Sequence, residues 1–246
     1  MPNFRLVLER SRGRYFKWLA HDDRIEAGYL EATVPVLEGN SALVLCHTLV
    51  GYIDAQGRPV AIYDSGLGAA DRPRPSERFA AMVLRSHSCI DFFGLIRRSA
   101  MAGALDGRPF FHGVDRAFLA LMALRGGLVQ LPVCLVQMRE HPGRYTRRFR
   151  ATRERAVWHD THARAVAAPT WRLYQEYLRR VRTENLAPAE RRRCYAVLAR
   201  WWGMNWNSLR VAADLVDIMV PGAVGFAEGL KTRLFGAAPG HFQNDI

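Results

Sequence analysis

Two adjacent carboxylates near the start of the sequence are the first residues suited to chemistry. Asp22 and Asp23 follow the apolar, aromatic run Tyr15–Leu19, and a helix-like pattern begins near Ile25. Carboxylate oxygens are the ligands that Mg²⁺ and Mn²⁺ prefer. An Asp directly before a helix is also a favoured N-cap. The residue pattern leaves both interpretations open, a cation site or a helix cap.

A second acid and a basic segment occur later in the chain. Asp115 opens a long apolar helix pattern, where an acid can act as a general base or as another helix cap. Arg139 and His141 come directly after an apolar, strand-like run. They can stabilise the negative charge of a leaving phosphate or lie in a solvated loop. Again the pattern alone does not choose.

Several other polar residues lie near expected strands without a pattern that predicts chemistry. Arg97 and Arg98 follow an apolar run and fit surface charges at a strand end. His47, His87 and His112 carry no recognisable role.

The elements that must position these residues alternate between strand and helix. Apolar runs bounded by turn residues predict strands, and apolar residues at helical spacing predict helices. Such alternation favours an α/β layer over an all-helical fold. The expected elements are helices at 4–11, 26–40, 76–86 and 113–127, strands at 14–20 and 90–98, a strand and hairpin within 41–64, and a strand pair or bent strand at 128–141.

The composition changes near residue 150. Over residues 171–220 the apolar residues follow helical spacing, with Ala187–Pro188 dividing two helices. We therefore expect two parts, an α/β domain over 1–150 and a helical C-terminal extension over 151–246.

The charge of the chain limits the classes of binding partner to expect. The 246 residues carry a formal net charge of +12, and Lys17 and Lys231 are the only lysines. A basic chain favours an anionic neighbour, such as nucleic acid, an anionic membrane surface or a phosphorylated substrate. Arginine suits contacts to phosphate, although a GC-rich genome produces the same bias. No nucleic-acid recognition motif is present, so nucleic acid is not an expected partner.

Cysteine spacing and hydropathy bear on the compartment. The four cysteines are widely spaced, without metal-site intervals, which is typical of free thiols in a reducing cytoplasm. No apolar run is long enough to cross a bilayer.

Four segments, taken in order, carry a resemblance to a known family. The chain resembles the later half of a family 2 glycosyltransferase of the GT-A fold, most closely the bacterial cell-envelope group, over roughly residues 2–150. The resemblance implies a truncated GT-A-like α/β sheet followed by helices. The segments that carry it are GRYFKWLAHDD, YIDAQGRPV, FFGLIRR and GVDRAFLALMALRGGLVQLPVCLVQMREHPG.

The resemblance also implies roles for the acidic and basic residues. Asp22 matches an acid that binds a divalent cation, Mn²⁺ or Mg²⁺, beside the donor diphosphate, and His21 could add a nitrogen ligand. Asp115 matches the general base that deprotonates the attacking hydroxyl in an inverting transfer. The first acid of the family's Asp-x-Asp element is replaced by Ala20, a departure that weakens the expected metal site. The remaining donor-binding residues implied are Asp23, Arg139 and His141.

The expected partners follow from the same resemblance. They are a nucleotide-sugar donor and a glycan or lipid-linked acceptor. Because the resemblance starts in the middle of the family's fold, we expect the chain alone to bind UDP- or GDP-sugars poorly. We also expect a homodimer or a second chain to cover the exposed sheet edge. The alternative is a non-catalytic partner or binding module derived from a glycosyltransferase.

The C-terminal third contains a tryptophan cluster with two interpretations. Trp201, Trp202 and Trp206 lie among arginines in helical segments. They could rest on an anionic membrane surface, which would place a cytoplasmic protein at the inner face of the cell membrane. Aromatic residues at helical spacing are more often buried, and this interpretation is slightly favoured.

Overall fold

A computed structural model describes residues 2–66, 70–105, 111, 113–144, 168–220, 222–223 and 226. Its helices are α1 (Pro2–Arg10), α2 (Tyr29–Gly39), α3 (Pro75–Leu84), α4 (Val114–Arg125), α7 (Pro169–Thr183), α8 (Pro188–Gly203) and α9 (Asn207–Met219), with short 3₁₀ helices η1 (Ile90–Phe93) and η2 (Arg98–Met101). Its strands are β1 (Tyr15–Phe16), β2 (Arg24–Ile25), β3 (Leu43–Ile53), β4 (Pro59–Tyr63), β5 (Leu95–Arg97) and β6 (Gly127–Arg139).

The strands form one mixed sheet in the order β1-β5-β3-β6-β2, with β4 also paired to β3. β3 and β6 run parallel, and the other pairs are antiparallel. The expected α/β fold class with a mixed sheet and following helices is confirmed. The parallel pair ends in register, with Ile53 opposite Arg139.

β6 shows why its sequence fits a bent strand. Leu131 lies opposite Thr48 and Cys134 lies opposite Leu49, so the register skips Pro132 and Val133. Proline cannot donate a ladder hydrogen bond and is tolerated at such bulges. Of the two predictions for this segment, the bent strand is confirmed.

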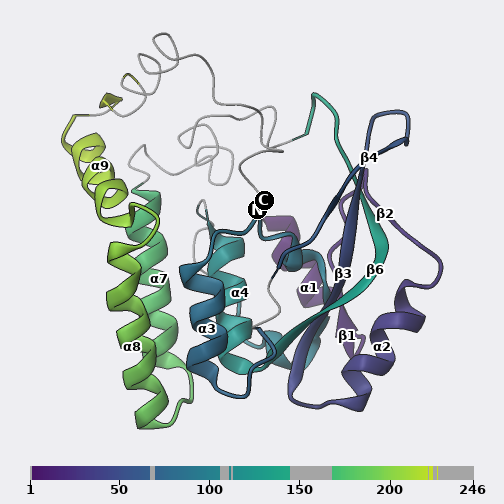
Figure 1. Ribbon diagram of the computed structural model, residues 1–246, viewed down its shortest axis with the longest axis horizontal. Coiled ribbons are helices and arrows are strands. Elements are labelled where there is room, and N and C mark those ends of the chain that lie inside the picture. Colours follow the sequence, from purple (N-terminus) through teal and green to yellow (C-terminus); the bar gives the residue numbers. More distant parts are fainter. Residues whose placement is uncertain are drawn as a thin grey trace.

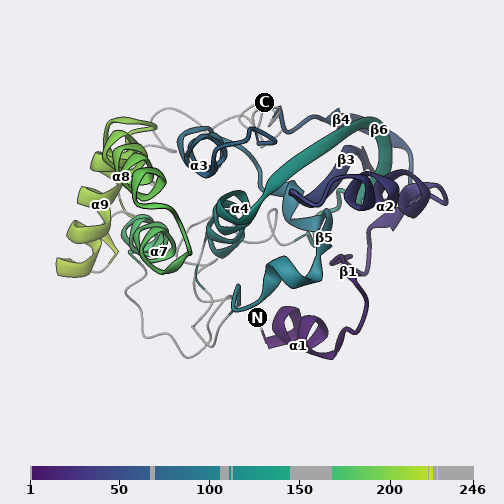
Figure 2. The same cartoon turned by 90° about the horizontal axis from the view of Figure 1, so that it is seen from below.

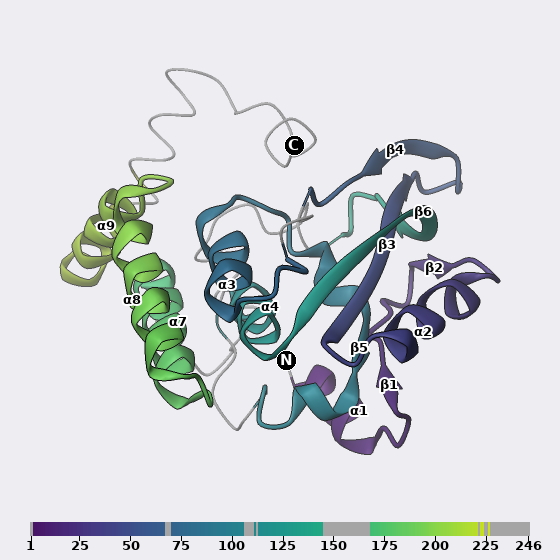
Figure 3. The ribbon, with the colours of Figure 1, turned by 60° about the horizontal axis from the view of Figure 1, so that its bottom comes forward.

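Helices cover both faces of the sheet. α2 packs against one face, and α3 and α4 lie on the other side (Figures 1 and 3). α7 and α8 form a further layer outside α3 and α4, and α9 lies at the outer edge of the molecule (Figure 2). α1 lies beside β1 (Figure 2). Just after β1, the Trp18 indole N–H donates to the Phe4 carbonyl of α1 at 3.1 Å.

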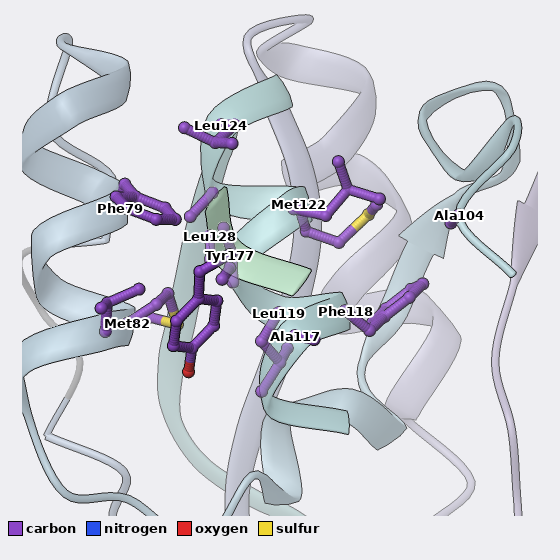
Figure 4. Packing of buried hydrophobic residues seen from close by; sticks show 14 of the residues in the cluster. Phe79, Met82, Ala104, Ala117, Phe118, Leu119, Met122, Leu124, Leu128 and Tyr177 are labelled. Carbon is purple, nitrogen blue, oxygen red and sulfur yellow. The ribbon is translucent and has the colours of Figure 1, made fainter. Parts of the chain in front are cut away.

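The outer helices share a hydrophobic core with the α/β part. Tyr177 of α7 is fully buried and lies between α3 and α4, with its ring centroid 6.0 Å from that of Phe79 (Figure 4). Leu198 and Trp201 of α8 belong to the same cluster. The helical region therefore closes the core of the α/β part.

Three local expectations are wrong. The strand expected at 90–98 is limited to β5, because Ile90–Phe93 form the 3₁₀ helix η1. The strand expected at 14–20 stops at Phe16, because Trp18 turns into the core and stacks on Phe92 at 4.3 Å between ring centroids. Arg97 is not a surface charge. Its guanidinium donates to the carbonyls of Leu37 and Leu43 at 2.6 and 3.2 Å, which ties α2 to β3.

The three tryptophans do not all fit one of the two interpretations. Trp201 is buried and Trp202 is half-buried, as the favoured interpretation predicts. Trp206 is 76% exposed. Among the helices that the structure describes, none has the length and apolar character required to cross a membrane.

Candidate functional site

The parallel strands β3 and β6 place their carboxyl ends together, and the acidic turn lies at the same edge. β2, directly after Asp23, pairs with β6, with Arg24 opposite Gln137. The β3–β4 turn begins at Asp54, just beyond the end of β3 (Figure 1). In open α/β sheets, ligands bind outside the carboxyl ends of the strands. The sheet topology therefore brings segments from three parts of the chain to one candidate site.

Asp22 and His141 are directly paired in this site. His141 Nε2 lies 2.8 Å from Asp22 Oδ2, and both side chains are only partly buried. Partial burial raises the pKa of Asp22, but the hydrogen bond from His141 and the nearby charges outweigh it, so the pKa lies below its ordinary value. His21 lies farther away, with Nδ1 3.8 Å from Asp22 Oδ1 and its side chain 95% exposed.

Asp23 and Arg139 are joined through the backbone. Asp23 Oδ1 accepts a hydrogen bond from the Arg139 backbone N–H at 3.0 Å, while burial raises the pKa of this carboxyl group. The Arg139 guanidinium donates to the carbonyls of Asp22, Asp54 and Ala55 at 3.2, 3.0 and 3.1 Å. Arg139 thus fixes the positions of two turns, and much of its donor capacity is used within the protein.

A half-buried lysine lies near Asp23 of the acidic turn. Lys17 Nζ donates to the Phe93 carbonyl and lies 4.7 Å from the centroid of the Tyr29 ring. Burial lowers the pKa of Lys17 to about 8, and the charge of Asp23 partly opposes this shift. Sequence reasoning missed this contact, although a lysine inside the aromatic run Tyr15–Leu19 was a signal, since a buried ammonium needs partners.

The helix-cap interpretation of the acidic turn is wrong. α2 begins at Tyr29, its N-cap is Gly28, and no side chain caps it. β2 separates Asp22 and Asp23 from this helix. The two carboxylates instead contact the segment that follows β6.

Asp115 lies in the first turn of α4, away from this cluster. The N-cap of α4 is Gly113, so Asp115 is not the cap, and its Oδ1 accepts the Arg116 backbone N–H at 2.8 Å. The negative charge of Asp115 favours the protonated forms of the His87 and Tyr177 side chains. Among the interactions of the described residues, none joins Asp115 to the acidic turn. Because Gly126 alone separates α4 from β6, α4 begins toward the carboxyl edge of the sheet.

The donor set limits how a cation could be held. Within the described ranges, no three His, Cys, Asp or Glu side chains form a metal-binding group. Ala20 has no ligand atom, which leaves Asp22 as the principal carboxylate. Mg²⁺ is often bound by one or two carboxylates together with substrate phosphates. The residues therefore fit a cation that shares its ligands with a diphosphate, and do not fit a cation enclosed by protein alone.

A second acid–histidine group lies in the interior and was missed by sequence reasoning. His47 Nδ1 lies 2.8 Å from Asp91 Oδ1, with both side chains buried. Burial raises the pKa of Asp91, but His47 outweighs this effect and the pKa lies below its ordinary value. Burial lowers the pKa of nearby His87 to about 4. The available signal was the position of His47 inside an apolar run, where a polar side chain requires a partner.

Comparison with known proteins finds likenesses among solved structures. No family profile matches the sequence, and no curated protein does. The chain is similar to the crystal structure of S. aureus TarS 1–349, a glycosyltransferase, with 12% identity and a TM-score of 0.46. The match covers 80% of this chain and 49% of the TarS chain, so the chain spans about half the length of that structure.

Proposed function

We propose that this chain acts in the transfer of a sugar from a nucleotide-sugar donor to a glycan or lipid-linked acceptor. The supporting observation is that Asp22, Asp23, Arg139 and His141 lie together at the carboxyl edge of the sheet. The resemblance to family 2 glycosyltransferases gives the same four residues as donor-binding residues. A ligand at this edge agrees with the general rule for open α/β sheets.

The proposed donor-binding roles follow from these contacts. Asp22 binds a divalent cation, Mg²⁺ or Mn²⁺, together with the diphosphate, and the cation supplies charge neutralisation for the leaving group. His141 lies on the same carboxylate and can donate to a phosphate oxygen. Asp23 and Arg139 are positioning residues, because they hold the acidic turn against the end of β6.

Asp115 is the proposed general base. Its carboxylate takes the proton of the acceptor hydroxyl as that oxygen bonds to the anomeric carbon and the bond to the diphosphate breaks. Displacement in one step inverts the sugar configuration. The support is its place at the start of α4, toward the edge of the sheet where the acidic turn lies.

Nucleotide binding tests the donor site directly. We expect UDP or GDP to bind weakly and only with a divalent cation, Mg²⁺ or Mn²⁺, which titration calorimetry detects. Asp22→Ala should abolish this binding, because it removes the principal carboxylate. Asp71→Ala is the matched control and should leave binding intact, because Asp71 is an exposed acid beside Gly127, at the opposite end of β6. Binding that survives Asp22→Ala would contradict the proposed donor site.

Turnover tests the base. With a donor and acceptor that support transfer, Asp115→Asn should leave nucleotide binding intact and lower kcat by about 10²–10⁴, the usual contribution of a positioned base. Asn keeps the size of the side chain and can accept the Arg116 N–H. Full activity of a stably folded Asp115→Asn protein would show that Asp115 is not the base.

A non-catalytic binding module is the second candidate. The observations that favour it are Ala20 in place of an acid and the pairing of Asp22 with His141. This candidate predicts nucleotide or glycan binding that depends on Asp22, without transfer to any acceptor. An Asp22-dependent transfer activity would exclude it.

A further inference from the structure

α9 turns its apolar side away from the protein. Five residues at helical spacing, which we call the outer face of α9, are all exposed: Leu209, Ala212, Leu215, Val216 and Met219. Met219 is 81% exposed, and Trp206, directly before the helix, is 76% exposed. A surface helix normally turns its apolar stripe toward the core. Along this stripe α9 has the opposite orientation, with its apolar side chains facing away from the core.

Specific contacts fix this orientation. Asp214 Oδ2 accepts the backbone N–H groups of Thr170 and Trp171 at 2.8 and 3.0 Å, and so caps the start of α7. Val211 and Asn207 are buried on the same side of α9. Turning the outer face inward would break the cap of α7 and expose these residues. The outward apolar face is therefore part of the folded structure.

The exposed charges of the outer helices α7, α8 and α9 are all of one sign. In the described parts of α7, α8 and α9, every exposed charged side chain is an arginine: Arg172, Arg182, Arg192, Arg193, Arg200 and Arg210. The acids are turned toward partners within the protein. Glu176 pairs with Arg179 and Arg180, Glu184 with Arg125, Glu190 with Arg193, and Asp217 accepts the Gly222 N–H.

We propose that the outer face of α9 docks on an anionic lipid surface. Apolar side chains enter the interfacial layer, Trp206 lies at its polar boundary, and exposed arginines attract acidic headgroups. Charge complementarity favours lipid over a second copy of this chain, since a symmetric pair would bring two arginine-rich surfaces together. α9 lies at the outer edge of the molecule, on the far side of α7 and α8 from the sheet (Figure 2). The proposal does not depend on sugar transfer.

Vesicle co-sedimentation of the full chain tests the proposal without any sugar or nucleotide. We expect binding to mixed phosphatidylcholine–phosphatidylserine vesicles, weakened by high salt, and much less binding to phosphatidylcholine alone. The double variant Leu215→Gln/Met219→Gln should lower the partition coefficient by about tenfold or more, because two apolar side chains no longer enter the interface.

A matched control separates this face from exposed apolar residues in general. Val60 and Ile62 of β4 are 53% and 68% exposed, so Val60→Gln/Ile62→Gln removes comparable side chains far from α9. This control should bind vesicles like the unaltered chain, and equal melting temperatures would show that both variants fold. Equal binding by both double variants would overturn the proposal. So would a concentration-dependent dimer that only the α9 variant disrupts, which would identify a second copy as the occupant.

Discussion

Two acid–histidine pairs in this molecule have the same contact distance in opposite surroundings. In both pairs an imidazole nitrogen lies 2.8 Å from a carboxylate oxygen. The side chains of Asp22 and His141 are 21% and 29% exposed, whereas those of Asp91 and His47 are 1% and 7% exposed. A solvent-accessible pair can exchange its internal contact for a ligand. A buried pair cannot, so its contribution is to the stability of the fold.

Desolvation explains why the same contact has different energetic consequences. Two charges removed from water lose hydration that their attraction must offset, and loss of one partner leaves the other charge buried without compensation. A pair near the surface remains hydrated and contributes little to stability.

The largest effect is expected at Asp91. Asp91→Ala should lower the free energy of unfolding by about 3–5 kcal/mol, because it leaves His47 buried without its acid. Urea denaturation followed by circular dichroism measures this change. The double variant His47→Leu/Asp91→Leu is the control, since apolar replacement of both partners should recover much of the loss. A loss below about 1 kcal/mol in Asp91→Ala would mean that burial does not distinguish the two pairs.

Acid stability should reveal the third member of the buried group. The pKa of His87 is about 4 in the folded protein, against an ordinary value of 6.5. At pH above 6.5 both states are neutral. As the pH falls from 6.5 to 4, the unfolded chain binds a proton that the folded protein does not, so stability falls by up to about 3 kcal/mol.

Denaturation curves across this pH range provide the measurement. His87→Gln should flatten the dependence between pH 6.5 and 4, whatever its effect on absolute stability. The unaltered chain, measured in parallel, provides the reference slope. An unaltered slope in His87→Gln would assign the acid sensitivity to other groups.

The smallest effect on stability is expected at the open pair. Asp22→Asn should change the free energy of unfolding by less than about 1 kcal/mol, since the pair is hydrated. Nucleotide binding, in contrast, should be lost. Urea denaturation and calorimetric nucleotide titration of the same preparation compare the two effects. A stability loss as large as that of Asp91→Ala, with nucleotide binding retained, would make Asp22 a structural residue and remove the contrast.

Much of the architecture could be predicted because local signals agree with the fold. The apolar spacing in α3 matches the face that it buries, the continuous apolar run of α4 matches its burial on all sides, and Pro132 marks the bulge in β6. The meeting of Asp22 with His141 could also be anticipated, since both follow apolar strand-like runs, although only the structure shows that they are paired.

The remaining features depend on contacts between distant parts of the chain. Trp18 leaves the expected strand because Phe4 and Phe92 form an aromatic site for it in the core. The partner of His47 lies in a separate segment, and no spacing rule relates the two residues. The same holds for Arg139, whose acceptors are carbonyls in two turns. In each case a tertiary contact, and not the local sequence, determines where the side chain lies.

The core shared by the outer helices and the α/β part also limits how this protein can change during evolution. Tyr177 and Trp201 fill space between and beside α3 and α4, where an independent module would present a polar surface. A recombination event that exchanged α7 and α8 for unrelated helices would expose Phe79 and neighbouring side chains to water. We expect these helices and the sheet to change only by coordinated substitution, so that both parts share one evolutionary history.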